Sequence, residues 1–308
     1  MSIRIAVFGQ APFGRDVTLR LAEAGHEIVA VHVPPDGGGR SDPLAEVAGE
    51  KGWPLFRYKG YRRKGQAIAE RVEEYLTLGA ELNVLPYTTV ILPPEIIDAP
   101  KHRSVCFHPS ILPAFRGGSA LAWQIIEGIE ESGISVFQPD DGVDTGPLYH
   151  QKGGVAISPI DNTASLYFDK LYPMGVEAMV ETVAAIDAGT ARLTPQAEAG
   201  ASFQGLVDED VAALDLAEDV VALDRRIRGC DPQPGAWLSL GEERIRLYGS
   251  RVESRSEPSE APGSILAVVE SGLLLAARGG ILRIQKVRRA TGKCVAHESG
   301  LEAGDRLI

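Results

Sequence analysis

Basic residues are in short supply in this sequence. Its 308 residues include 31 Lys and Arg against 42 Asp and Glu, so the formal net charge is −11 with histidine neutral. Proteins that bind nucleic acid through its phosphates normally carry a surplus of positive charge. The balance argues against a general nucleic-acid-binding protein, although a local basic patch is compatible with it.

Cysteine is also scarce, and long apolar runs are missing. The three cysteines, Cys106, Cys230 and Cys294, are too far apart in the sequence for a disulfide framework or a zinc cluster. No apolar run reaches the ~18 residues that span a bilayer. The apolar stretch at the start is too short for a signal peptide. We therefore predict a reduced, cytoplasmic compartment and no membrane partner.

The sequence does contain short apolar runs that alternate with helical periodicities. Residues 3–9 form an aliphatic run that ends in glycine, residues 13–24 have helical spacing, and residues 26–32 form a second run. A strand, a helix and a strand within about 30 residues predict a parallel sheet. The alternation continues with strands at 82–85, 104–108 and 134–138 and helices at 66–76, 121–128 and 164–186, the last interrupted at Pro173.

The composition changes after the last of these helices. Residues 189–204 are small, polar and turn-forming, which predicts a linker between a domain of residues 1–188 and a domain of residues 205–308. The second domain has a predicted helix at 216–228 and short strands at 236–240, 244–248, 265–269, 273–277 and 281–287. The predicted fold class is α/β, a doubly wound and mostly parallel sheet followed by a small OB-like open β-barrel.

The glycine-rich turn after the first strand is a weak signal. Gly9 and Gly14 flank Gln10, Ala11, Pro12 and Phe13 before the first helix. The dinucleotide fingerprint needs three glycines at fixed offsets, and the Gly-Lys-Ser/Thr of a phosphate loop is missing. The turn therefore predicts no bound nucleotide cofactor.

Two segments that follow strands carry groups able to do chemistry. His108 ends a strand and is followed by Pro109, at the place where parallel-sheet proteins hold reactive groups. On its own it is equally compatible with a structural, hydrogen-bonded histidine. Residues 140–147, with three aspartates and two glycines, follow the next strand but lack the glutamate of a calcium loop, so we predict no metal. An aspartate that meets His108 would favour the imidazolium.

A third segment, residues 85–94, is largely apolar and offers backbone groups rather than charges. Such a loop could wall a flat heteroaromatic ligand, although the segment taken alone favours ordinary packing.

Taken in order, these segments resemble the folate-dependent formyltransferase superfamily. The specific stretches are His108-Pro109-Ser110-Ile111-Leu112-Pro113, with the Arg116-Gly117-Gly118 that follows, and Asp140-Asp141-Gly142-Val143-Asp144-Thr145-Gly146. In that superfamily an Asn stands two residues before the histidine, whereas this chain has Cys106. In this respect it is similar to the N-terminal hydrolase domain of 10-formyltetrahydrofolate dehydrogenase, where the position is apolar. Residues 228–237 resemble the C-terminal domain shared with methionyl-tRNA formyltransferase.

The resemblance implies an enzyme that takes a formyl group from 10-formyltetrahydrofolate. His108 and Asp144 would be the catalytic pair, with Cys106 where an Asn usually assists. The residues implied to bind folate are Leu85, Pro86, Tyr87, Ile91, Leu92, Pro109, Ser110, Asp140, Asp141 and Gly142. Protonated His108 would donate to the tetrahedral oxyanion while Asp144 keeps it charged and accepts a proton from the nucleophile. Because a thiol is a weak donor, Cys106 predicts slower transfer to amines or a preference for water. Neither a metal nor a nicotinamide is implied.

The formyl acceptor stays open among four readings. These are hydrolysis of 10-formyltetrahydrofolate, formylation of methionyl-tRNA, N-formylation of an amino sugar, and an inactive folate-binding protein. The acidic net charge argues against tRNA, whereas a basic cluster at residues 57–64 and a second one at 283–289 offer places for phosphates, although such clusters are more often solvated faces. The sequence does not determine the oligomeric state.

Overall fold

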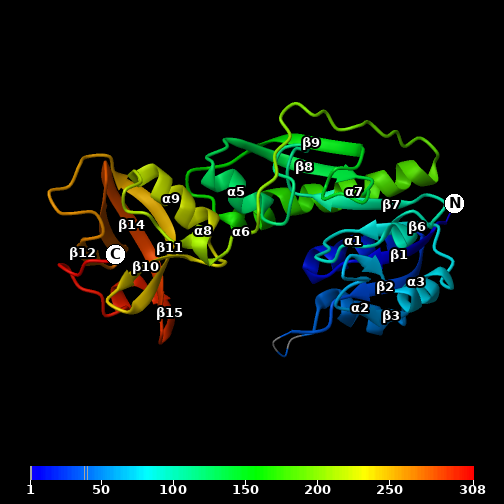
Figure 1. Cartoon of the computed structure of the whole chain (residues 1–308), viewed down its shortest axis with the longest axis horizontal. Helices are drawn as coiled ribbons and strands as arrows, with labels where there is room; N and C mark the ends of the chain where they lie inside the picture. Colours follow the sequence, from blue (N-terminus) through cyan, green and yellow to red (C-terminus); the bar gives the residue numbers. More distant parts are fainter. Residues whose placement is uncertain (1, 38, 40) are drawn as a thin grey trace. The chain divides into compact units, whose positions relative to one another are not determined.

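The first strands of the chain assemble into a mostly parallel sheet. The computed structural model describes residues 2–37, 39 and 41–308. Its seven-stranded sheet has the order β3-β2-β1-β6-β7-β8-β9, and the pairs from β3 to β7 are parallel whereas β8 runs antiparallel to β7 (Figure 1). The strands are β1 (Arg4–Phe8), β2 (Glu27–Val33), β3 (Leu55–Arg57), β6 (Leu82–Leu85), β7 (Ser104–His108), β8 (Glu131–Phe137) and β9 (Leu148–Ala156). The predicted, mostly parallel α/β sheet is confirmed.

Helices cover both faces of this sheet because its central strands are apolar on both sides. The helices that precede the second part of the chain are α1 (Ala11–Glu23), α2 (Pro43–Lys51), α3 (Ala69–Leu76), α4 (Pro94–Ile97), α5 (Ala120–Ile126), α6 (Thr163–Ser165), the π-helix η1 (Leu166–Leu171) and α7 (Tyr172–Asp187). On one face, Phe107 of β7 meets Phe13 of α1, with ring centroids 4.5 Å apart. A side chain at Gly175 of α7 would collide with both rings, so glycine is needed there.

The opposite face carries a second apolar cluster and the end of β7. Cys106 packs there with Leu85, Leu92, Phe137 and Ile96 of α4. Because side chains alternate along a strand, Cys106 and His108 project to this face and Phe107 to the other. Cys106 and His108 therefore both point toward the loops that follow β6 and β8.

Local turn chemistry explains where the observed helices differ from the predicted ones. The helix predicted from Gln66 begins instead at Ala69, because Lys64 and Gly65 have positive φ angles of 52° and 80° and form a hairpin turn between β4 (Arg62–Arg63) and β5 (Gln66–Ala67). The helix predicted from Leu216 begins after Asp219, whose carboxylate accepts hydrogen bonds from the amides of Val221 and Ala222. The same bonds lower the pKa of Asp219.

The last part of the chain forms an antiparallel sheet, as predicted for the C-terminal β domain. Its order is β10-β11-β14-β13-β12, with β15 paired to β14. The elements are α8 (Glu209–Ala212), α9 (Val220–Gly229), β10 (Ala236–Leu240), β11 (Glu243–Ser254), β12 (Ile265–Val269), β13 (Gly272–Ala277), β14 (Gly280–Arg289), β15 (Gly292–Val295) and the 3₁₀ helix η2 (Ala296–Glu298). Leu223 and Ile227 of α9 pack on Leu247 and Val287 of the sheet.

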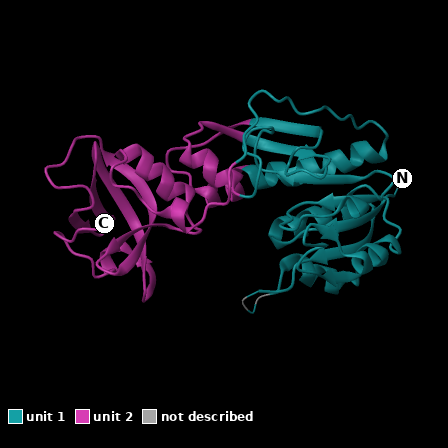
Figure 2. Cartoon of the chain, in the orientation of Figure 1, with its two compact units in different colours: residues 1–118, 133–153, 171–203 teal, residues 119–132, 154–170, 204–308 magenta. Residues whose placement is uncertain are grey.

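The chain divides into two compact units that do not follow the chain order (Figure 2). Unit 1 contains residues 1–118, 133–153 and 171–203, and unit 2 contains residues 119–132, 154–170 and 204–308. Most of the segment predicted as a linker, residues 189–204, thus belongs to unit 1, whereas residues 119–132 and 154–170 of the predicted first domain belong to unit 2. In the described part of the chain, no helix combines the length and the apolar character needed to cross a bilayer.

Candidate active site

The end of β7 and the loop after β8 bring two predicted residues together. His108 is 5% exposed, and its Nδ1 lies 3.4 Å from Oδ2 of Asp144. The other ring nitrogen, Nε2, lies 2.7 Å from the carbonyl oxygen of Phe115. Because a carbonyl oxygen can only accept, Nε2 donates this bond, whereas the 3.4 Å contact of Nδ1 with Asp144 is an ion-pair distance and not a hydrogen bond. The short bond from Nε2 fixes the ring and leaves Nδ1 on the side of Asp144.

Asp144 is held in an unusual backbone conformation. Its φ angle of 55° lies in the left-handed region, which residues other than glycine rarely adopt. Oδ2 of Asp144 accepts a hydrogen bond from the amide of Gly117 at 2.8 Å, and its side chain is 19% exposed. At Gly146, close by, a Cβ would collide with the carbonyl of Gln138, so this loop needs glycine to fold over the sheet.

Cys106 lies in the apolar cluster beside this pair. Its thiol donates a weak hydrogen bond to the carbonyl oxygen of Phe107, at 3.7 Å. Burial and the negative charge of Asp144 both raise the pKa of the thiol. Because the thiolate is the nucleophilic form, this cysteine is poorly suited to attack a formyl group. Cys106 therefore places only a weak hydrogen-bond donor, its thiol, next to the pair of His108 and Asp144.

The predicted folate-binding residues divide into buried supports and exposed loop tips. Leu85, Pro86, Leu92 and Ser110 are buried. The hydroxyl of Ser110 donates to the carbonyl of Ala114 at 2.6 Å, so its side chain is committed to the loop itself. The exposed members are Tyr87, Ile91, Asp140, Asp141 and Gly142, whereas Pro109 is half-buried.

Exposed apolar side chains flank the site on both loops. Ile91 is 62% exposed and Tyr87 41% on the loop after β6, and Val143 is 44% exposed on the loop after β8. The second loop also lines a hollow of about 290 Å³ with Gln138, Pro139 and residues of α4. Such surfaces suit an apolar, flat ligand that is oriented by backbone polar groups.

Asp140 and Asp141 make their contacts within the loop and with Arg62. Oδ1 of Asp140 accepts hydrogen bonds from the amide of Gly142 at 3.0 Å and from the hydroxyl of Thr145 at 2.6 Å. Asp141 is paired with Arg62, as described below. Over the described residues, no group of three or more His, Cys, Asp or Glu side chains is placed to ligate a metal ion.

Arg62 joins the two loops, and the sequence did not single it out. It is one of the basic residues at 57–64, but the hairpin turn directs it inward to 22% exposure. Its Nη2 donates to the carbonyl of Leu92 at 2.9 Å and lies 2.5 Å from Oδ1 of Asp141. One guanidinium therefore ties the loop after β6 to the loop after β8.

We expect Arg62→Ala to weaken binding of tetrahydrofolate by roughly 3- to 10-fold. The exposed ion pair by itself contributes little, but its loss also frees the Leu92 carbonyl and leaves both loops less ordered. Isothermal titration of each variant with tetrahydrofolate measures the effect. Arg63→Ala, a change at the exposed neighbouring position, is the matched control. Equal weakening by both variants would contradict a specific role for Arg62.

A second buried histidine is excluded as an acid or base. His32 of β2 stacks on Phe8 at 4.2 Å between ring centroids and on Phe56 at 4.8 Å, and its Nδ1 lies 2.7 Å from the hydroxyl of Tyr61. Burial lowers its pKa to about 3. The ring is therefore neutral at physiological pH and serves packing.

Comparison with known proteins shows the family of this chain. The family model described as "Formyl transferase" matches residues 3–183, and "Formyl transferase, C-terminal domain" matches residues 207–302. The chain belongs to the formyl transferase family. The predicted family and the prediction of an enzyme are thereby confirmed.

Two relatives and one solved structure are similar to this chain. Mitochondrial 10-formyltetrahydrofolate dehydrogenase of Mus musculus is 39% identical over 99% of this chain, which spans 34% of that protein. Methionyl-tRNA formyltransferase of Variovorax paradoxus is 32% identical over 96% of this chain and 94% of its own length. HypX from Aquifex aeolicus, solved in complex with tetrahydrofolic acid, shares the fold, with a TM-score of 0.69 and 19% identity over 94% of this chain and 45% of that one. The chain thus spans about a third of the dehydrogenase that it matches.

Proposed function

We propose that this chain hydrolyses 10-formyltetrahydrofolate to tetrahydrofolate and formate. The observation that carries the proposal is the His108–Asp144 contact, next to Cys106 and beneath the exposed apolar tips of two loops. The folate ring system would lie between the loop after β6 and the loop after β8. Leu85, Pro86, Leu92, Pro109 and Ser110 would support that surface, and Tyr87, Ile91, Asp140, Asp141 and Gly142 would line it.

The pair supplies the groups that the reaction needs. Asp144 accepts a proton from water as the water oxygen bonds to the formyl carbon. The Nδ1–H of His108 donates to the formyl oxygen as negative charge develops there. When the bond from carbon to N10 breaks, the proton held by Asp144 passes to N10. Formate and tetrahydrofolate are then released, and no oxidant is used.

Cys106 favours water over a bulkier amine in this scheme. An amide at this position would add a neutral donor to the oxyanion, whereas the thiol is a weak donor. Seven 10-formyltetrahydrofolate dehydrogenases are 36–39% identical to the chain, compared with 32% for the methionyl-tRNA formyltransferase. Both observations support hydrolysis as the first candidate.

Formylation of methionyl-tRNA is the second candidate. It is supported by the relative of that name, which this chain covers over 94% of its length. The net charge of −11 is unfavourable for tRNA binding. A cytoplasmic location fits both candidates.

One assay separates these functions. The protein is incubated with 10-formyltetrahydrofolate alone, and formate and tetrahydrofolate are measured. We expect stoichiometric release of both, with little change on addition of methionyl-tRNA. A large, salt-sensitive acceleration by methionyl-tRNA would instead establish the second candidate, and binding of folate without any turnover would overturn both.

We expect Cys106→Asn to raise formyl transfer to an amine relative to hydrolysis, on the order of 10-fold, because the amide adds a donor to the oxyanion. Cys106→Ala, which adds no donor, is the control and should leave the ratio within about 2-fold. The ratio is measured with 10-formyltetrahydrofolate in the presence of methionyl-tRNA, and thermal unfolding shows whether each variant is folded. An unchanged ratio in a folded Cys106→Asn protein would count against the proposed effect of the thiol.

A further inference from the structure

Gln196 lies in the segment predicted as a linker, but its amide is fully engaged at the candidate active site. Its Nε2 donates to the carbonyl oxygen of Asp144 at 2.8 Å and to that of Gly146 at 2.7 Å. Its Oε1 accepts from Nη2 of Arg116 at 2.8 Å and from Nε at 3.2 Å. Both donors and the acceptor of this amide therefore have partners within unit 1.

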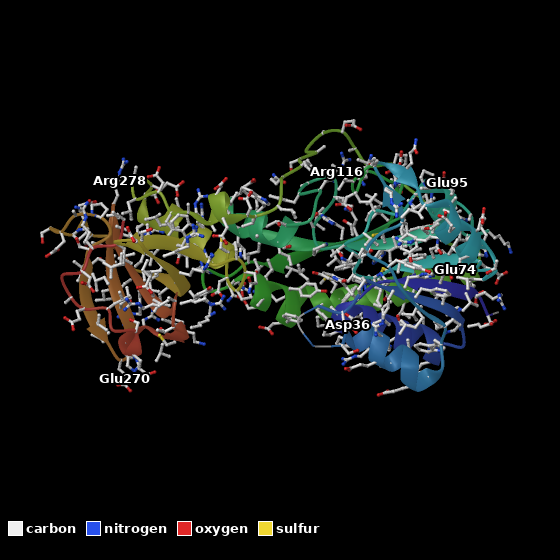
Figure 3. The ribbon with its side chains drawn as sticks, turned by 60° about the horizontal axis from the view of Figure 1, so that its bottom comes forward. Asp36, Glu74, Glu95, Arg116, Glu270 and Arg278 are labelled. Atoms are coloured by element: carbon white, nitrogen blue, oxygen red, sulfur yellow. The ribbon has the colours of Figure 1, made fainter. Side chains whose placement is uncertain are left out.

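Arg116 fixes the orientation of this amide. A guanidinium can only donate, so the oxygen of Gln196 must face it and the NH₂ group must face the two carbonyls. Arg116, labelled in Figure 3, follows the Phe115 whose carbonyl holds His108. It precedes the Gly117 whose amide holds Asp144. The same short loop thus contacts His108, Asp144 and Gln196.

Backbone bonds attach the segment around Gln196 to this loop. The hydroxyl of Ser202 accepts the amide of Phe115 at 2.8 Å, and the amide of Arg116 donates to the carbonyl of Ser202 at 3.0 Å. Thr194 exchanges two backbone hydrogen bonds with Leu148, at 2.7 and 2.9 Å. The segment is therefore tied down on both sides of Gln196.

We propose that Gln196 is a positioning residue that holds Asp144 against His108, an inference that rests on the proposed function. Asp144 has a left-handed backbone, which persists only where its surroundings impose it. Gly117 holds its carboxylate, and Gln196 holds its carbonyl. Without the amide of Gln196 the backbone can relax, and the carboxylate then moves away from Nδ1 of His108. Gln196 acts through Asp144 and does not touch the reacting atoms.

The test compares Gln196→Ala and Gln196→Glu with the matched control Gln204→Ala. Gln204 lies at the end of the same segment and donates to Glu127 in unit 2. We expect kcat for hydrolysis to fall 10- to 100-fold in both Gln196 variants, while the Kd for tetrahydrofolate changes by less than 3-fold. Gln196→Glu keeps the bond to Arg116 but turns a carboxylate toward two carbonyls, so its loss should be at least as large. The control should retain the wild-type kcat.

A double variant distinguishes positioning from general damage. In an Asp144→Asn background we expect Gln196→Ala to change the residual rate by less than 2-fold, because the group that it positions no longer accepts a proton. Retained kcat in Gln196→Ala, or the full loss in the Asp144→Asn background, would overturn the inference.

Amide exchange decides the inference even if wild-type protein does not hydrolyse the folate. We expect the Gly117 amide, which donates to Asp144, to exchange at least 10-fold faster in Gln196→Ala than in Gln204→Ala. Unchanged protection of Gly117 would refute the positioning role independently of the proposed function.

Discussion

His108→Ala and Asp144→Asn are each expected to slow turnover of 10-formyltetrahydrofolate by about 10²- to 10⁴-fold, the range for removal of a general acid or base. His108→Ala removes the donor that faces the formyl oxygen. Asp144→Asn retains an oxygen for the Gly117 amide but no longer accepts a proton from water. Since the two residues act on one transition state, the double variant should be little slower than the worse single variant.

The measurement is release of tetrahydrofolate at saturating substrate, together with circular dichroism to show that each variant is folded. His150→Ala is the matched control, because His150 of β9 is 39% exposed and lies 3.9 Å from Glu181, away from the pair. It should keep the wild-type rate. Near-normal turnover in either His108→Ala or Asp144→Asn would remove the proposed catalytic pair.

Asp224→Ala is expected to lower the stability of unit 2 by about 3–5 kcal/mol, the usual cost of leaving a buried charge unpaired. Asp224 and Arg228 are one helical turn apart in α9, with Nε and Oδ2 at 2.7 Å and side chains only 6% and 8% exposed. Arg228 also donates to the carbonyl of Asp161 at 2.9 Å within unit 2. Without Asp224, the guanidinium of Arg228 stays buried and loses its carboxylate partner.

Hydrogen exchange of α9 and β11 amides as a function of urea measures this loss within unit 2. Glu209→Ala is the control, because Glu209 is 48% exposed where it pairs with Arg244 and Arg246, and exposed pairs contribute about 0–1 kcal/mol. Replacing both buried partners, Asp224→Leu with Arg228→Met, should recover much of the stability. Equal losses from Asp224→Ala and Glu209→Ala would show that burial does not set the contribution of the pair.

Local patterns predicted the elements of the fold more reliably than their ends. The aliphatic runs became β1, β2, β6, β7 and β8 because strands buried on both faces need such residues. The start of α3 was wrong because two residues with positive φ, Lys64 and Gly65, form a hairpin that periodicity does not reveal. Helix α2 and strands β3 and β9 were not predicted, and the exposed residues of β9 lack the apolar run that marked the other strands.

Residues of the candidate site could be expected from the sequence where they lie in short motifs, and not where they lie outside such motifs. His108 and Asp144 each stand in a segment that resembles a known family, so their convergence could be expected, and the structure places them 3.4 Å apart. Arg62 looked like one member of an exposed basic cluster. Gln196 lay among small and polar residues that indicate a linker.

By itself, the sequence determined the strand-ending histidine, the glycine-containing aspartate loop and the family, because these depend on residue types at short, fixed spacings. Only the tertiary structure decided which carbonyl holds the imidazole, which guanidinium joins the two loops, and which distant amide supports Asp144. These contacts join residues up to 79 positions apart, as Arg62 and Asp141 are. A hydrogen bond depends on where the packed backbone brings two groups, and no local pattern encodes that meeting.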